Sequence, residues 1–183
     1  MNVEQMIERA EKLSHEYTND EPNERNHDRE GCYRTCSISG GFAFKLAIRE
    51  SGIGCNRAEW DFYTMTTDDV RKVLAKPRYI SKNGKVIVFD CLTMAIDVGT
   101  YGTPERNEFN KQADDCADKL LATVRESHKH GINDLHNHNF GRDDGTGKMV
   151  CTDYGALAFA AEANDSGQRV YNRDVLHQMM VSS

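Results

Sequence analysis

Two strand-turn-strand patterns constrain this chain more than any other feature. The first joins two strand-like segments around a Gly-Gly turn within residues 32–48, and the second joins two more around a Lys-Asn-Gly turn within residues 78–92. Glycine readily adopts the positive φ that tight hairpin turns need, and β-branched and aromatic residues are frequent on both sides of these turns. The last segment, KVIVFDCL, is apolar enough to be buried on both faces of a sheet. The sequence therefore predicts an antiparallel sheet that contains two hairpins.

Helical patterns precede and follow the first hairpin. Residues 2–16 carry apolar side chains at helical spacing, which predicts an amphipathic helix. Residues 17–31 are almost devoid of apolar side chains, which predicts a polar loop. After the first hairpin we expect a glycine-containing loop, a helix over residues 56–65, and a second helix that begins at Thr67 as its N-cap.

The longest helical pattern begins after Pro104. Apolar side chains fall on one stripe of residues 105–128, which predicts a helix that faces the core and ends before Gly131. A polar loop and a short hairpin-like segment come next, and the last 28 residues have room for one or two short helices. This order of elements predicts an α+β fold with an antiparallel sheet and a separate helical part.

Composition limits the class of protein. A chain of 183 residues with 38% hydrophobic and 28% charged residues fits a single globular domain. The net charge of −6 argues against nucleic acid as a partner, because binding to phosphates needs clustered cations. The N-terminus has no signal-peptide pattern, and no apolar run reaches the roughly 18 residues of a membrane span. We expect a soluble, cytoplasmic protein with no membrane partner.

The cysteines and histidines raise the question of a metal. Six scattered cysteines mostly lie within strand or helix patterns, as buried free thiols do in a reducing compartment. Cys32 and Cys36 could share a strand face, but they supply only half of a structural zinc site. Four histidines close in sequence are better candidates, although such clusters are most often solvated loops. These are His128, His130, His136 and His138.

The segment INDLHNHNFGRDDGTGKMVCTDYG carries the chemistry. Asp134 precedes Asn139 by five residues, and Asp153 follows Asn139 by fourteen. A loop carboxylate can accept the proton of an attacking hydroxyl, while an amide oxygen and a second carboxylate hold Mg²⁺ against nucleotide phosphates. Asn and Asp also serve commonly as caps and turn formers. The joint spacing, with a long helix before it and a hairpin turn inside it, favours the functional interpretation.

At these residues the sequence resembles the protein-kinase superfamily. That family has a catalytic-loop Asp, an Asn five positions later, and D-F-G after a short hairpin. Here Tyr154 replaces the Phe. The form D-L-H-x-x-N is similar to aminoglycoside-type kinases and to the small kinase-like proteins of tailed bacteriophages, and the size of the chain favours the phage group. The resemblance covers roughly residues 30–157.

The resemblance implies roles for individual residues and, as cofactors, ATP and Mg²⁺. Lys45 would orient the α- and β-phosphates, with Glu59 on the next helix as its ion-pair partner. Adenine would lie near Asp90 and Leu92, and Gly31 is what remains of the glycine-rich phosphate loop. The implied set is Asp134, Lys45 and Glu59 as catalytic residues, Lys45, Gly31, Asp90 and Leu92 for the nucleotide, and Asn139 and Asp153 for the metal.

The resemblance also implies a compact kinase-like domain over residues 1–183 with a truncated helical C-lobe. Residues 1–29 would form the N-terminal helix and polar loop, residues 30–92 the antiparallel-sheet N-lobe, and residues 93–183 the reduced C-lobe. Two features depart from the family pattern: the phosphate loop lacks two of its three glycines, and no A-P-E follows Gly155. Recognition of a protein substrate must therefore differ from that of ordinary kinases.

These features lead to one favoured function and three alternatives. The favoured function is an ATP- and Mg²⁺-dependent Ser/Thr protein kinase of the small phage type that modifies host proteins. A pseudokinase-like protein that inhibits a host enzyme by binding is the main alternative. A small-molecule kinase would need a larger helical region, and an HNH nuclease, whose letters occur in LHNHN, would need a different order of elements.

Overall fold

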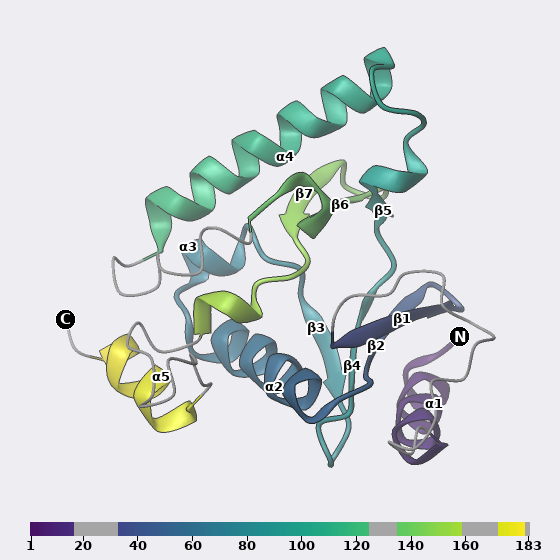
Figure 1. The fold of residues 1–183 in the computed structure, drawn as a ribbon, viewed down its shortest axis with the longest axis vertical. Helices are drawn as coiled ribbons and strands as arrows, with labels where there is room; N and C mark the ends of the chain where they lie inside the picture. Colours follow the sequence, from purple (N-terminus) through teal and green to yellow (C-terminus); the bar gives the residue numbers. More distant parts are fainter. Residues whose placement is uncertain (17–32, 125–134, 159–171, 182–183) are drawn as a thin grey trace. The chain divides into compact units, whose positions relative to one another are not determined.

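The computed structural model describes residues 1–16, 33–124, 135–158 and 172–181, which form an α+β fold with antiparallel sheets (Figure 1). The elements in chain order are α1 (Val3–Glu16), β1 (Arg34–Ser39), β2 (Phe42–Ala47), α2 (Glu50–Met65), α3 (Asp68–Arg71), β3 (Pro77–Ile80), β4 (Val86–Asp90), β5 (Thr93–Met94), η1 (Ala95–Asp97), α4 (Pro104–Thr123), η3 (Asn137–Asn139), β6 (Phe140–Asp143), β7 (Lys148–Cys151), η4 (Gly155–Ala158) and α5 (Arg173–Val181). The predicted polar loop over residues 17–31 lies outside the described residues.

Contacts divide the chain into two compact units. The first contains Met1–Trp60 and Lys76–Cys91, and the second contains Asp61–Ala75 and Leu92–Ser183. The division at residues 91–92 lies beside the predicted boundary between the lobes. Residues 61–75, which the kinase resemblance assigns to the N-lobe, group with the second unit.

The first unit is organised around a four-stranded antiparallel sheet in the order β1-β2-β4-β3. The glycines of its two hairpin turns have positive φ, at 58° for Gly40, 86° for Gly41 and 76° for Gly84. Both predicted hairpins are confirmed. The central strand β4 is buried along Val86–Phe89, as its unbroken apolar sequence predicts.

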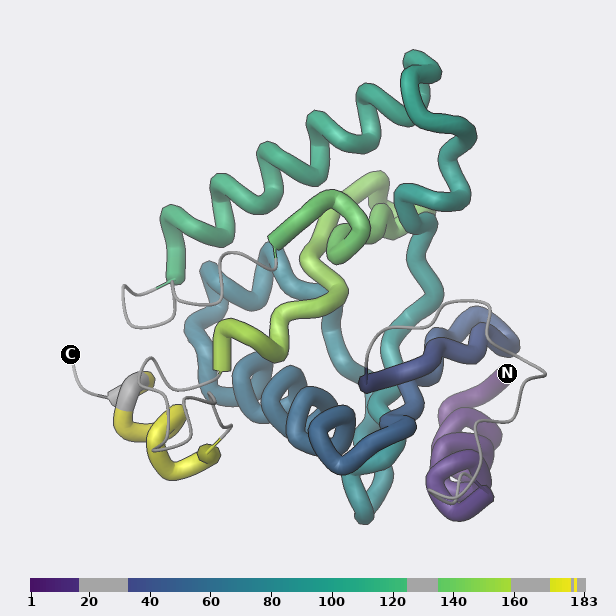
Figure 2. The backbone as a smooth tube through the Cα atoms, viewed as in Figure 1, coloured from purple at the N-terminus to yellow at the C-terminus, as the bar shows by residue number. Residues whose placement is uncertain are grey.

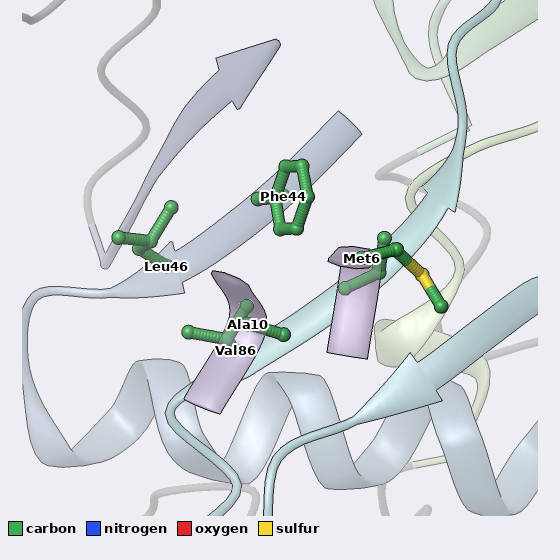
Figure 3. Packing of buried hydrophobic residues seen from close by; sticks show 6 residues of the cluster. Met6, Ala10, Phe44, Leu46 and Val86 are labelled. Atoms are coloured by element: carbon green, nitrogen blue, oxygen red, sulfur yellow. The ribbon is translucent and has the colours of Figure 1, made fainter. Parts of the chain in front are cut away.

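Helix α1 covers one face of this sheet. Met6 and Ala10 are almost fully buried and pack against Phe44, Leu46 and Val86 (Figure 3). Side chains alternate between the faces of a strand, so Phe44 and Leu46 point to this helix. The predicted amphipathic helix is confirmed. It buries its apolar stripe on the sheet.

Helix α2 begins earlier than its sequence predicts. It starts at Glu50, so the expected glycine-containing loop before residue 56 is wrong. Gly52 explains the difference, because a Cβ on this residue would lie 2.3 Å from the backbone oxygen of Tyr33 and 3.0 Å from the Cβ of Ala47. The first turn of the helix therefore needs glycine to approach the strands closely, at a cost in helix propensity.

The second unit contains a three-stranded antiparallel sheet, β5-β6-β7, beside the long helix α4 (Figure 2). Thr103 caps α4, and Phe109, Ala113 and Leu120 are buried on one stripe. The helix ends at Thr123, five residues before the predicted end. Val124 has extended backbone angles, which terminate it.

Three further predictions can be compared with the structure. Thr67 caps α3, and its side chain accepts a hydrogen bond from the backbone N–H of Val70. The five cysteines among the described residues are free thiols, but only Cys116 and Cys151 are buried. Cys32 lies outside the described residues. Among the described helices, none combines the length and the apolar composition needed to cross a bilayer.

Candidate functional site

An ion pair between Lys45 and Glu59 is the central feature of the first unit. The Lys45 Nζ lies 3.0 Å from one carboxylate oxygen of Glu59 and 3.2 Å from the other. The Glu59 side chain is fully buried, and that of Lys45 is 15% exposed. The lysine also lies over the ring of Phe89, 4.9 Å from its centroid, which favours a cation there. The structure thus pairs the two residues that the kinase resemblance implies as ion-pair partners.

The register of the sheet explains how these two side chains meet. Lys45 follows Phe44 on β2, so it points away from α1 and toward the opposite face. Glu59 lies on α2, about two turns after the close approach at Gly52, and reaches the lysine from this face. Lys45 pairs with Ile87 on the buried strand β4, which shields the ion pair from water on one side.

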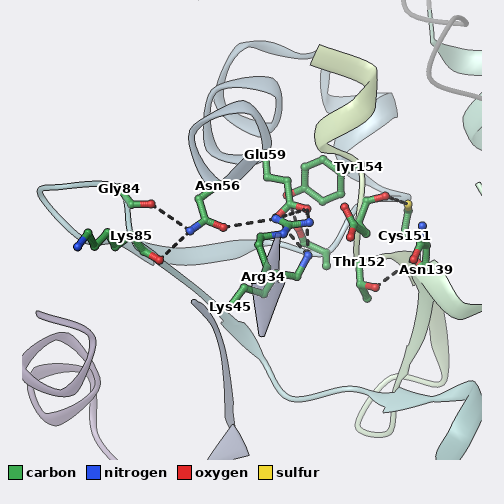
Figure 4. A network of polar contacts seen from close by, with 12 residues as sticks. Arg34, Lys45, Asn56, Glu59, Gly84, Lys85, Asn139, Cys151, Thr152 and Tyr154 are labelled. Atoms are coloured by element: carbon green, nitrogen blue, oxygen red, sulfur yellow. Dashed lines mark hydrogen bonds and ion pairs between the residues drawn. The ribbon is translucent and has the colours of Figure 1, made fainter. Parts of the chain in front are cut away.

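Arg34 and Asn56 extend the pair into a network, which the sequence analysis missed (Figure 4). Arg34 Nη1 and Nη2 both lie 3.1 Å from Glu59 Oε1. Arg34 also donates to the side-chain oxygen of Asn56 at 3.4 Å. The Asn56 amide nitrogen in turn donates to the backbone oxygens of Gly84 and Lys85, each at 3.0 Å.

A local signal for both residues is present in the sequence. In a hairpin centred on Gly40-Gly41, Cys36 pairs with Lys45, so Arg34 two residues earlier lies on the same face as the lysine. Asn56 precedes Glu59 by three residues and shares its face of the helix. The register of the predicted hairpin is thus enough to place Arg34 on the face of Lys45.

In the second unit, the hairpin β6-β7 brings the predicted metal ligands close in space. Asn139 directly precedes β6, and Asp153 follows β7 by two residues. The backbone oxygen of Asn139 accepts hydrogen bonds from Thr152, at 2.7 Å from its backbone nitrogen and 3.1 Å from its hydroxyl (Figure 4). Asn139 and Asp153 are therefore held at the same open end of the hairpin, and both are partly exposed.

Tyr154 anchors the backbone next to Asp153. Its side chain is fully buried, its hydroxyl donates to the backbone oxygen of Ala75 at 2.9 Å, and its ring lies 6.2 Å from that of Phe62. Backbone hydrogen bonds of 2.8 Å join Cys151 to Val73 and to Ala75. This hydrogen bond explains why tyrosine, rather than phenylalanine, stands in the D-Y-G sequence. The tyrosine hydroxyl pairs with a buried carbonyl to which phenylalanine could not donate.

The remaining predicted site residues have other surroundings or lie outside the described residues. Asp134 and Gly31 are outside the described residues, so their roles stay predictions. Asp90 ends β4, where the guanidinium of Arg78 on β3 binds its carboxylate. Leu92 packs against Gly141, where an added Cβ would lie 2.9 Å from its own. An adenine site at Asp90 and Leu92 also stays a prediction.

No cluster of three His, Cys, Asp or Glu side chains that could hold a metal occurs within the described residues. In this part of the chain the predicted magnesium site consists of one carboxylate, from Asp153, and one amide oxygen, from Asn139. Of the four clustered histidines, His136 and His138 are described, with their rings 5.8 Å apart in an edge-on contact. His128 and His130 lie outside the described residues.

Comparison with known proteins adds no relative: no protein-family model, no curated protein and no solved structure matches this chain.

Proposed function

We propose that this chain is an ATP- and Mg²⁺-dependent phosphotransferase of the protein-kinase type that transfers phosphate to serine or threonine hydroxyls of proteins. The buried Lys45–Glu59 ion pair carries the proposal. Burying two charges costs several kcal/mol per ion, so such a pair contributes little to stability and is better explained by a function. A lysine held in this way can bind phosphate oxygens, as the resemblance to kinases implies.

The ligands at the end of the β6-β7 hairpin supply the second part of the proposed chemistry. A carboxylate and an amide oxygen suit Mg²⁺, which binds few protein oxygens and keeps several waters or phosphate oxygens. Among the described residues, Asn139 and Asp153 offer such groups at this end of the hairpin. In the proposed reaction Asp134 accepts the proton of the attacking hydroxyl, and host proteins are the substrates that the similarity to phage kinases implies.

Binding of MgATP tests the phosphate site. A ligand that binds only the folded state at about a hundred times its Kd stabilises that state by about 2.7 kcal/mol. We expect MgATP to raise the unfolding temperature of the wild type, Asp153→Asn to lose the Mg²⁺-dependent part, and Lys45→Met to lose most of the shift. Asp118→Asn, on the exposed side of α4, is the matched charge control and should behave as wild type.

Transfer of labelled phosphate tests the reaction itself. Wild-type protein incubated with γ-labelled ATP and a bacterial extract should label proteins on serine or threonine, and Asp153→Asn and Asp134→Ala should not. The absence of any MgATP-dependent stabilisation in correctly folded wild type would contradict the proposal. Binding without transfer would instead support the pseudokinase-like alternative, in which the chain acts on a partner through binding alone.

A further inference from the structure

We infer that Arg34 is a positioning residue of the phosphate site: it keeps Glu59 neutralised and leaves Lys45 available to the phosphates of the nucleotide. The inference rests on the proposed function. It concerns a residue to which the kinase resemblance assigns no role.

The geometry of the Glu59 carboxylate is the first step. Both cations contact the same oxygen, Oε1, with Lys45 Nζ at 3.0 Å and Arg34 Nη1 at 3.1 Å. The carboxylate is fully buried, while the Arg34 and Lys45 side chains are 11% and 15% exposed. A buried carboxylate needs a cation, because an uncompensated charge in a low-dielectric interior is strongly destabilising. Glu59 therefore contacts two cations, although one would be enough to neutralise its charge.

The way in which Arg34 is held distinguishes the two cations. Its guanidinium is fixed through Asn56, whose amide orientation is set by the backbone oxygens of Gly84 and Lys85. Arginine has a rigid, planar fork of donors, whereas lysine carries a compact charge on a flexible stem. The structure therefore provides a fixed cation for Glu59 and a second one that can shift toward a ligand.

Charge gives the energetic consequence. Arg34, Lys45 and Glu59 together carry one more positive than negative charge, and they lie where water screens little. When Lys45 turns to a phosphate oxygen, Arg34 still neutralises Glu59. If Arg34 were removed, Glu59 would keep only Lys45 of these two cations. The phosphates would then compete with the buried Glu59 carboxylate for Lys45.

A comparison of nucleotides that differ in phosphate content tests the inference. Calorimetry would give the affinities of MgATP and of adenosine for wild type, Arg34→Gln, Arg34→Lys and Lys45→Met. A charge-assisted hydrogen bond contributes enough that Arg34→Gln should lower the ratio of the ATP affinity to the adenosine affinity by about tenfold. Arg34→Lys should restore part of this ratio. Arg49→Gln, an exposed arginine after β2, is the matched control and should leave it unchanged.

Unfolding without any ligand gives a second, independent readout. Since either cation can neutralise Glu59, Arg34→Gln and Lys45→Met should each lower the denaturation midpoint modestly, and the double variant should lower it by more than the sum. If wild type binds no ATP, the proposed function and this inference both fail. If wild type binds ATP and Arg34→Gln keeps the wild-type affinity ratio, or the two substitutions are additive in unfolding, the inference alone is wrong.

Discussion

At the scale of single residues, Glu59 shows how a buried charge depends on its partners. Its carboxylate is fully buried and contacts two cations, Arg34 and Lys45, that are themselves mostly buried. The three side chains come from β1, β2 and α2, so the ion pairs join both strands to the helix. The stability of the first unit should therefore be sensitive to this one carboxylate.

The substitution Glu59→Gln tests this dependence. It keeps the size of the side chain but leaves two mostly buried cations without their carboxylate, so we expect a loss of about 3 kcal/mol in the free energy of unfolding. Urea denaturation followed by circular dichroism measures it. Glu8→Gln, on the exposed side of α1, is the control and should change stability by less than about 0.5 kcal/mol. An equally small effect for Glu59→Gln would show that the charge of this residue does not matter for folding.

Tyr79 and Glu11 form a hydrogen bond whose strength depends on pH. The tyrosine hydroxyl donates to the Glu11 carboxylate at 2.5 Å, which ties β3 to α1. This bond lowers the pKa of Glu11 below 4.5 and raises the pKa of Tyr79 from 10.0 to about 12. The bond needs an ionised Glu11 and a protonated Tyr79. The bond therefore contributes fully to stability between pH 4.5 and pH 10.0, and its contribution decreases below and above this range.

Tyr79→Phe should reveal this dependence. Near neutral pH we expect the variant to be less stable than wild type by about 1 kcal/mol. The difference should shrink as pH falls through the lowered pKa of Glu11, and again as pH rises from 10.0 toward 12. Denaturation of both proteins across this range measures it. A difference that stays constant with pH would mean that the hydroxyl acts by packing rather than by this bond.

At the scale of elements, helix α2 contains two glycines with opposite expected effects. A Cβ on Gly52 would lie 2.3 Å from the backbone oxygen of Tyr33, whereas a Cβ on Gly54 would meet nothing within 4 Å. Alanine is favoured over glycine in a helix by about 1 kcal/mol. Gly54→Ala should therefore raise the free energy of unfolding by up to about 1 kcal/mol. Gly52→Ala should lower the free energy of unfolding, because the backbone at Tyr33 or at Gly52 must move to make room for the Cβ.

Denaturation midpoints of the two variants measure this contrast, and each serves as the other's control. Equal effects would contradict the close approach at Gly52. If Gly54→Ala also destabilised the protein, the helix would not extend through the first four residues after Glu50 in solution.

The same helix shows which elements the sequence can predict. Both hairpins follow from local features, a glycine turn and alternation, and they are confirmed. The start of α2 does not follow from local features. Gly52 and Gly54 disfavour a helix locally, and the close approach of Gly52 to Tyr33 is a tertiary contact that the local sequence does not reveal. Strand β5 has only two residues, and pairing with β6 defines it. The Lys45–Glu59 pair could be predicted from a resemblance, but the Arg34 contact required the register of β1.

At the scale of the whole molecule, the two compact units share α2. Its residues up to Trp60 group with the first unit and those from Asp61 with the second. Helix formation is cooperative, so hydrogen bonds that cross this point should couple the folding of the two units. Each unit also has its own probe. Trp60, the single tryptophan, reports on the first unit, and the buried thiols of Cys116 and Cys151 report on the second.

Unfolding monitored by both probes tests whether the units fold together. Burial raises the pKa of Cys116 to about 11, so its thiol should resist alkylation until the second unit opens, whereas the exposed Cys91 should react at once. With increasing urea, Trp60 fluorescence and the labelling of Cys116 and Cys151, located by peptide mass spectrometry, should change with the same midpoint. Two separate midpoints would show that part of α2 unfolds before the rest and that the units unfold independently. Coincident midpoints would mean that a substitution such as Glu59→Gln in the first unit also weakens protection of Cys116 in the second.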